Sequence, residues 1–132
     1  MSEGIDAVRR ICEGWNEMTL EEWRSICTPD VAYQNMPWDR TTITGPDAIH
    51  QTLEGFAGNW NVQMEVRQLD GTANVAFAER VEHFSPKAPG GTEEGAPAKE
   101  PFDLPVTGVF EITDEGKISA WRDYFDRRAM KS

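Results

Sequence analysis

Polar side chains recur at two-residue spacing along segments that we predict to be strands. Arg80 and Glu82 share one face of such a segment, and Asp123 shares a face of another with Trp121 and Phe125. A carboxyl group inside an apolar wall is costly unless it is paired. Two carboxyl groups near one arginine can act as general acid and general base if their surroundings separate their protonation states. These residues therefore form a candidate catalytic site.

The residues that precede this charge pair on the same strand face are small. Ala76 and Ala78 come before Arg80 at two-residue spacing and would leave space above the sheet. An earlier short strand places Tyr33 and Asn35 on one face, again as two polar groups separated by one residue. The sequence thus predicts a cavity with polar groups in its wall.

Each of these patterns also has a purely structural interpretation, which the pattern alone leaves open. Arg80 and Glu82 are consistent with an exposed ion pair worth less than about 1 kcal/mol. Asp123 could pair with a neighbouring arginine at a sheet edge. Tyr33 and Asn35 could end a strand and cap a turn.

Three helices are predicted in the first part of the chain. Apolar residues recur at helical spacing over residues 5–15, and a Thr-x-x-Glu capping box opens a second helix over residues 20–27. A third helix begins at Pro46, a residue favoured at the first helical position, and breaks near Gly55 and Gly58. The apolar faces of these helices need a partner layer.

That partner is a run of strands in the rest of the chain. Alternating apolar residues and turn signals predict strands over residues 31–35, 62–69, 74–84, 104–113 and 117–125. Helices followed by hairpin-connected strands indicate an α+β fold, with an antiparallel sheet that carries its helices on one face.

A segment between two of these strands, residues 85–101, has no apolar periodicity. It is rich in Pro, Gly, Ala and charge, which predicts a long mobile hairpin loop inside a single domain of residues 1–132. Two interpretations stay open for it: an inert insertion, or a lid and partner contact at the mouth of a pocket.

Composition and charge exclude several classes of function. The formal net charge is −10, and so acidic a surface repels phosphate backbones and anionic lipid. We therefore expect neither nucleic-acid nor membrane-surface binding, whereas a neutral apolar substrate would be indifferent to the charge. The sequence shows no signal-peptide apolar region and no apolar run of about 18 residues, which predicts a cytoplasmic protein.

The cysteines and histidines offer no competing site. Cys12 and Cys27 match no metal or redox motif and are predicted to be buried free thiols on helices. His50 lies on the third helix, and His83 faces away from Arg80 by strand alternation, so both are interpreted as structural.

Several short blocks around these residues resemble limonene-1,2-epoxide hydrolases. They are YQNMP at 33–37, ERVE at 79–82, GVF at 108–110 and WRDYFD at 121–126, with weaker matches in GPDA at 45–48 and QTL at 51–53. The resemblance runs in order from residue 33 to residue 126. It implies a cone-shaped barrel of the nuclear-transport-factor-2-like and SnoaL-like superfamily, with a highly curved, mixed, mainly antiparallel sheet and N-terminal helices enclosing an apolar pocket. It also implies a homodimer.

The same resemblance implies a role for each polar residue. Asp123 matches the family's base and would hold the attacking water with Asn35 and Tyr33. Arg80 matches the arginine that bridges two carboxyl groups, and Glu82 stands where the family carries its acid, an aspartate. The expected substrates are a small apolar epoxide and water, with no metal or other cofactor. The apolar candidates for the pocket lining are Met36, Trp38, Leu53, Phe56, Ala78, Leu104, Val106, Trp121 and Phe125.

Two departures and two rival functions accompany this hypothesis. Glu82 is one methylene longer than aspartate, so its carboxyl would move by roughly 1 to 1.5 Å, and we expect Glu82→Asp to retain or raise activity. The long segment 85–101 is the second departure. The rivals are an isomerase or cyclase, including an epoxide-opening cyclase, and a non-catalytic carrier of apolar ligands, because fold alone does not select a function.

Overall fold

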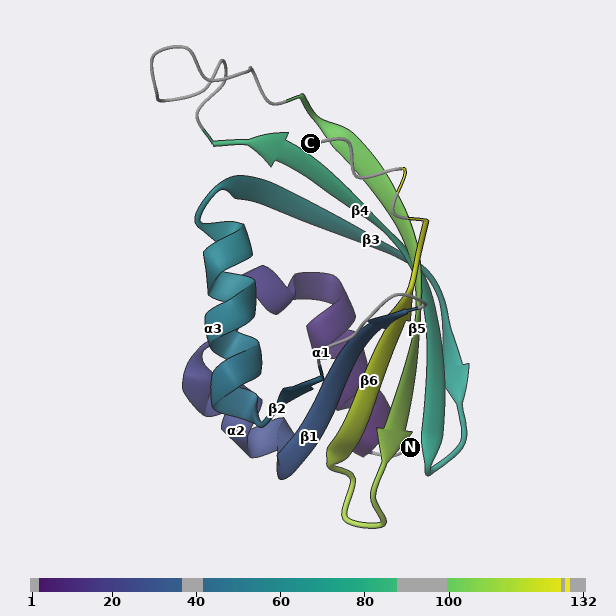
Figure 1. The fold of residues 1–132 in the computed structure, drawn as a ribbon. Helices are drawn as coiled ribbons and strands as arrows, with labels where there is room; N and C mark the ends of the chain where they lie inside the picture. The colour runs from purple at the N-terminus through teal and green to yellow at the C-terminus, as the bar shows by residue number, and fades with distance from the viewer. Residues whose placement is uncertain (1–2, 37–41, 88–99, 127, 129–132) are drawn as a thin grey trace.

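A computed structural model describes residues 3–36, 42–87, 100–126 and 128 of the chain. A strongly curved sheet wraps around a layer of helices on its concave side (Figure 1). Within the described residues the sheet has six strands, in the order β2-β1-β6-β5-β4-β3. The predicted α+β class, with helices ahead of a mixed sheet, is confirmed.

The helical layer consists of α1 (Glu3–Gly14), a 3₁₀ turn η1 (Trp15–Glu17), α2 (Leu20–Ile26) and α3 (Pro46–Ala57). The capping box predicted at the start of α2 is present, since Thr19 and Glu22 bond each other's backbone N–H groups. One detail of the prediction is wrong, since Cys27 begins a strand instead of ending a helix. The predicted end of the third helix near Gly55 and Gly58 is confirmed, because α3 runs through Gly55 and is capped at Gly58.

The sheet is built from β1 (Cys27–Met36), β2 (Ile43–Thr44), β3 (Trp60–Gly71), β4 (Val75–Pro86), β5 (Phe102–Ile112) and β6 (Ile118–Tyr124). Neighbouring strands are antiparallel except for β1 and β6, which pair in parallel. Register shifts interrupt three of these pairings, in β1, β3 and β5, and such irregularities increase local bending and twist. They help the sheet to close around the helices.

The boundaries around the predicted loop also differ. Ser85 and Pro86 belong to β4, which is longer than the sequence pattern indicated. Residues 88–99, the bulk of the predicted loop, lie outside the described residues, as does Trp38.

Aromatic rings form the centre of the core between sheet and helices. Trp23 of α2 stacks on Trp121 of β6 at 6.0 Å, and Phe110 of β5 stacks on the same indole at 5.6 Å. All three are fully buried. Burial of such side chains contributes roughly 1.5–3 kcal/mol each, so this stack is a main support of the curved sheet.

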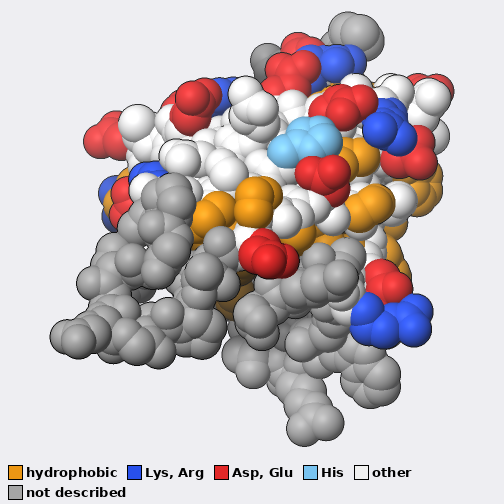
Figure 2. All heavy atoms as spheres, turned by 90° about the horizontal axis from the view of Figure 1, so that it is seen from above, with side chains coloured by type: hydrophobic (Ala, Val, Ile, Leu, Met, Phe, Trp, Pro, Cys, Tyr) orange, Lys and Arg blue, Asp and Glu red, His pale blue; other side chains and the backbone are white. Residues whose placement is uncertain are grey.

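The charged side chains on the surface are consistent with the strongly negative net charge of the chain. Acidic side chains are spread over the face seen from above, with basic ones between them, and a few hydrophobic side chains emerge beside the undescribed residues (Figure 2). None of the described helices has the length and apolar character needed to cross a membrane.

Candidate active site

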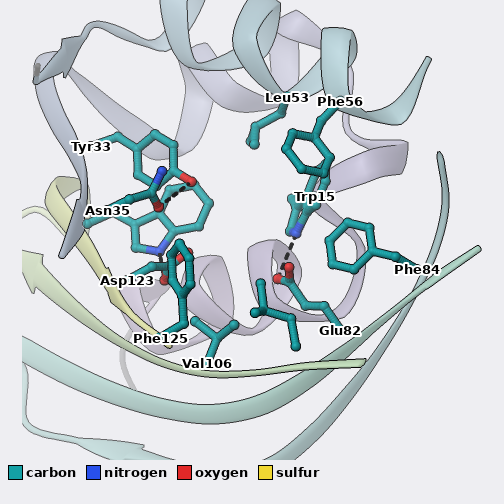
Figure 3. A pocket seen from close by; sticks show the side chains of 12 residues that line it. Trp15, Tyr33, Asn35, Leu53, Phe56, Glu82, Phe84, Val106, Asp123 and Phe125 are labelled. Atoms are coloured by element: carbon teal, nitrogen blue, oxygen red, sulfur yellow. Dashed lines mark hydrogen bonds between the residues drawn. The ribbon is translucent and has the colours of Figure 1, made fainter. Parts of the chain in front are cut away.

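A cavity lies between the concave face of the sheet and the helices (Figure 3). The volume of the cavity together with its open mouth is about 440 Å³. Most of its wall is aliphatic or aromatic, and two carboxyl groups, those of Glu82 and Asp123, stand in that wall. The lining residues are Trp15, Tyr33, Asn35, Leu53, Phe56, Glu82, Phe84, Leu104, Val106, Trp121, Asp123 and Phe125.

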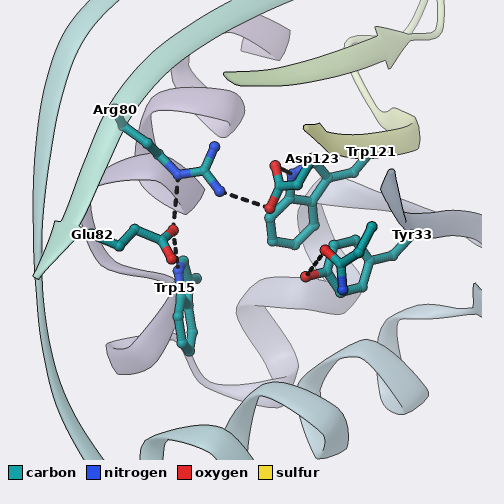
Figure 4. Close-up of polar contacts among 7 residues, drawn as sticks. Trp15, Tyr33, Arg80, Glu82, Trp121 and Asp123 are labelled. Carbon is teal, nitrogen blue, oxygen red and sulfur yellow. Dashed lines mark hydrogen bonds and ion pairs between the residues drawn. The ribbon is translucent and has the colours of Figure 1, made fainter. Parts of the chain in front are cut away.

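Arg80 connects the two carboxyl groups (Figure 4). Its Nε donates to Glu82 Oε2 at 2.9 Å, and its Nη2 donates to Asp123 Oδ2 at 2.8 Å. Arg80 is 1% exposed, and Glu82 and Asp123 are each 5% exposed. The interpretation of Arg80 and Glu82 as an exposed surface pair is therefore wrong. The three side chains form one buried chain of ion pairs.

Strand order explains how these residues meet. Arg80 and Glu82 lie two residues apart on β4, and Asp123 lies on β6, with β5 between them. β5 presents Gly108 opposite Asp123, so the Arg80 side chain can cross this strand without meeting another side chain. Asp123 pairs with an arginine in the interior of the sheet and not at an edge, because β6 is flanked by β1 and β5.

Asp123 uses both of its oxygens as acceptors. Oδ2 accepts from Arg80, and Oδ1 accepts from Trp121 Nε1 at 2.6 Å. Burial raises the pKa of Asp123 above its ordinary value, with Arg80 opposing this effect and the nearby Glu82 adding to it. A carboxylate with a raised pKa is a stronger proton acceptor, which is what a general base requires.

Arg80 stays charged in this setting. Burial alone would lower the pKa of its guanidinium, but Asp123 and Glu82 together raise it well above the ordinary value. A fixed positive charge between two carboxyl groups favours one shared proton over two negative charges in an apolar cavity.

Tyr33 and Asn35 lie beside Asp123, on the neighbouring strand. Asn35 is the register partner of Asp123 in the parallel pairing of β1 with β6. The Tyr33 hydroxyl donates to Asn35 Oδ1 at 3.0 Å, and the Tyr33 ring stacks on Trp121 at 4.2 Å. Burial, followed by the charge of Asp123, raises the pKa of Tyr33 and keeps its phenol protonated. The structure thus brings all five predicted polar residues together.

The apolar part of the prediction is partly correct. Six of the nine predicted residues line the cavity: Leu53, Phe56, Leu104, Val106, Trp121 and Phe125. Met36 does not, because Tyr33 and Asn35 use the inner face of β1 and alternation turns Met36 to the other face. Ala78 is fully buried beside Gly108, against which the Arg80 guanidinium packs, and it does not line the cavity either.

Two lining residues escaped the sequence analysis, Trp15 and Phe84. Trp15 was interpreted as part of the buried stripe of the first helix, yet its Nε1 donates to Glu82 Oε2 at 2.9 Å. A signal was present, because a buried indole N–H needs an acceptor and a helix stripe offers none. Phe84 shares the strand face of Arg80 and Glu82, and alternation alone would have included it.

The remaining candidates stay outside the cavity. His83 contacts Asp103 and Glu65 on the other side of β4, as its strand position predicted, and these two carboxylates raise its pKa. Cys12 and Cys27 are buried free thiols, and burial raises the pKa of each to about 12. The described part of the chain contains no group of three His, Cys, Asp or Glu side chains placed to hold a metal ion.

Comparison with known proteins identifies relatives of this fold. A family model described as SnoaL-like domain matches residues 8–121. The chain is also similar to the structure of an LEH-like epoxide hydrolase from M. tuberculosis, with 22% identity, a TM-score of 0.73, and 97% of this chain and 86% of that chain covered.

Other solved structures carry different descriptions. A candidate SnoaL-like polyketide cyclase from Jannaschia is 16% identical, with a TM-score of 0.79 and coverage of 97% of this chain and 88% of that chain. A hypothetical protein from Catenulispora acidiphila with a ketosteroid isomerase-like fold is 18% identical, with a TM-score of 0.73 and coverage of 94% and 88%. At these identities the similarity establishes the fold alone.

Proposed function

Since the chain belongs to the SnoaL-like domain family, whose fold serves several chemistries, we propose its function from the site: it adds water to a neutral, apolar epoxide and releases a vicinal diol. The observation that carries this proposal is the buried chain Glu82–Arg80–Asp123 in the wall of an otherwise apolar cavity. The similarity to an LEH-like epoxide hydrolase supports it.

Hydrogen bonding favours opposite protonation states for the two acids. Both oxygens of Asp123 accept N–H bonds, which suits an ionised carboxylate. On Glu82 both donors converge on Oε2, and Oε1 has no bonding partner among the described residues, so it has room for a proton. With Asp123 ionised and Glu82 neutral, the charge of Arg80 is balanced inside the apolar cavity.

Epoxide opening then needs a single concerted step. A water molecule held by Asp123, Asn35 and Tyr33 loses one proton to the Asp123 carboxylate while its oxygen forms a bond to a ring carbon. The ring C–O bond breaks, and the departing oxygen takes the proton of Glu82. The diol thus gains a hydroxyl group from the water and a proton from Glu82, and transfer of a proton from Asp123 back to Glu82 restores the starting state.

Product analysis in isotopically labelled water tests this proposal. Hydrolysis of an epoxide places one solvent oxygen in the diol. The variant Asp123→Asn has a side chain of similar size, and it should form no diol although circular dichroism shows it to be folded. Diol formation by Asp123→Asn at the wild-type rate would remove Asp123 from the role of base.

The same experiment separates the second candidate, an epoxide-opening cyclase. The similarity to a candidate polyketide cyclase motivates it, and the acid–base pair would serve it equally well. A hydroxyl of the substrate would replace water as nucleophile, so the product would contain no solvent oxygen. A carrier of apolar ligands would bind the epoxide and leave it unchanged.

We also propose that the protein forms a homodimer through the outer face of the sheet. Phe77 on β4 and Tyr124 on β6 are large hydrophobic side chains that are 52% and 41% exposed. Both flank β5 on the face opposite the cavity, since Ala78 and Asp123, their chain neighbours, are turned inward. A partner that packs on this face would remove both apolar side chains from water, which favours association.

A further inference from the structure

The carboxyl group of Glu82 is held by two donors on one oxygen. Arg80 Nε and Trp15 Nε1 both donate to Oε2, each at 2.9 Å (Figure 4). These donors come from different layers of the fold, one from strand β4 and one from the 3₁₀ turn η1. The second oxygen, Oε1, forms no hydrogen bond with the described residues. The two oxygens of this carboxyl group are therefore chemically different.

Side chains next to Trp15 in the sequence anchor the turn on which it lies. Trp15 is 5% exposed and begins the 3₁₀ turn directly after α1. The next residue, Asn16, donates through Nδ2 to the backbone oxygen of Val62 at 3.2 Å, which attaches the turn to β3. Arg10 of α1 forms a two-pronged ion pair with Glu22 of α2, at 3.0 and 3.1 Å, across the same turn. The indole N–H is thus fixed before any substrate enters.

We propose that Trp15 is a positioning residue that keeps the acidic proton of Glu82 on Oε1 and so directs it toward the epoxide oxygen. The inference deepens the proposed function and rests on it. A neutral carboxyl group has one accepting oxygen and one hydroxyl oxygen. Two N–H donors aimed at Oε2 make it the accepting oxygen, because a hydrogen there would oppose both donors.

The glutamate and the tryptophan fit each other. Glu82 is one methylene longer than the aspartate of the limonene-1,2-epoxide hydrolases. The longer side chain brings its carboxyl group within reach of both Arg80 Nε and Trp15 Nε1. Without the indole N–H, Arg80 Nε alone would orient the group, and the proton would be shared between both oxygens. A smaller share of enzyme molecules would then have the proton in position for transfer.

Trp15→Phe tests this inference, and replacement of Trp23 by benzothienylalanine, which has a ring of the same size without the N–H, is the matched control. Trp23 is another buried tryptophan, but its Nε1 has no bonding partner in the described structure. We expect Trp15→Phe to lower kcat for epoxide opening by about 10- to 100-fold, the loss typical of one hydrogen bond to an ionisable group. Benzothienylalanine at position 23 removes an N–H that has no partner among the described residues and keeps the stacked ring, so it should leave kcat close to the wild-type value. Replacing Trp15 by benzothienylalanine removes the N–H and keeps the ring size, and should cause the same loss.

A double-variant cycle shows whether Trp15 acts through Glu82. In a Glu82→Gln background, which has no acidic proton to direct, Trp15→Phe should lower the remaining kcat less than about twofold further. Equal fold losses in both backgrounds would indicate a packing role and overturn the inference, while leaving the proposed function intact.

Spectra of the indole N–H groups provide a readout that needs no turnover. The chain has five tryptophans, and substitutions assign their signals in a proton–nitrogen correlation spectrum. Glu82→Gln should shift the Trp15 signal, and Asp123→Asn should shift the Trp121 signal, which serves as internal reference. An unchanged Trp15 signal overturns the inference. If Glu82→Gln shifts the Trp15 signal but the wild-type protein opens no epoxide, the proposed function is overturned. The proposed role of Trp15 in directing the proton of Glu82 is then overturned as well.

Discussion

Gly108 lies opposite Asp123 in the antiparallel pairing of β5 with β6, at the point where the Arg80 side chain crosses from β4. A Cβ atom on Gly108 would lie 3.0 Å from Arg80 Nη1, 3.0 Å from Asp123 Oδ1 and 2.9 Å from the ring of Phe110. These separations are shorter than ordinary van der Waals contacts. The ion pair between Arg80 and Asp123 therefore depends on a residue without a side chain at position 108.

Gly108→Ala should impair catalysis more than folding. The added methyl group displaces the guanidinium and the carboxylate by a few tenths of an ångström, and misplacement of reacting groups on this scale lowers the rate of epoxide opening by about tenfold or more. The matched control is Gly55→Ala, because a Cβ atom there meets nothing within 4 Å on the described part of α3. That variant should keep full activity and melt at a slightly higher temperature. Wild-type kcat in Gly108→Ala would contradict the requirement for glycine.

The contacts of Glu82 reverse an expectation drawn from the sequence. Resemblance to a family with aspartate at this position led us to expect that Glu82→Asp retains or raises activity. The structure shows that the longer side chain reaches Trp15 and Arg80 with one oxygen, and aspartate would withdraw from both. We now expect Glu82→Asp to lower kcat by about tenfold, and Glu82→Gln to lower it much further, to a small residual rate. Initial rates on one epoxide compare the three proteins, and a Glu82→Gln variant as active as wild type would exclude Glu82 as the acid.

The activity should depend on pH through Asp123. Its pKa is raised by burial, so the carboxylate takes up a proton at a higher pH than an exposed aspartate, whose pKa is about 3.9. As the pH falls through the raised pKa, Asp123 becomes protonated and can no longer accept a proton from water, and kcat falls. The midpoint of this loss should lie above about pH 4, at a pH where circular dichroism still reports a folded protein. Activity that persists below the ordinary aspartate range would contradict Asp123 as the base.

The proposed dimer makes a separate prediction about Phe77. Phe77→Asp places a charge on the exposed outer face of β4, and a dimer that covers this face should dissociate. Sedimentation velocity measures the change in mass. Gln51→Asp introduces the same charge at an exposed position of α3, away from that face, and should leave the assembly unchanged. A wild-type protein that sediments as a monomer would refute the proposed dimer.

Local spacing was enough to predict most of the polar residues in the site. Side chains of a strand alternate between its faces, so Arg80 and Glu82 had to share a face, and so did Tyr33 and Asn35. The same rule placed His83 on the opposite face, where the structure finds it. A period of two is a property of the strand itself and needs no knowledge of the neighbouring strands.

Very short or end-of-element features were harder to predict. β2 has two residues, too few to show any period, and was missed. Cys27 continued the apolar stripe of the second helix, yet the chain leaves the helix at that residue and enters β1. Helix ends respond to the following segment as much as to their own residues, which makes boundaries uncertain from sequence.

The amino-acid sequence by itself determined the order of elements, the face of each strand and the supply of two acids and an arginine. Only the tertiary structure decided which of them touch. Arg80 meets Asp123 across 43 residues because only β5 separates β4 from β6. Glu82 meets Trp15 across 67 residues because the helical layer lies on the concave side of the curved sheet (Figure 1). Such contacts depend on strand order, register and the missing side chain at Gly108, which no local periodicity encodes.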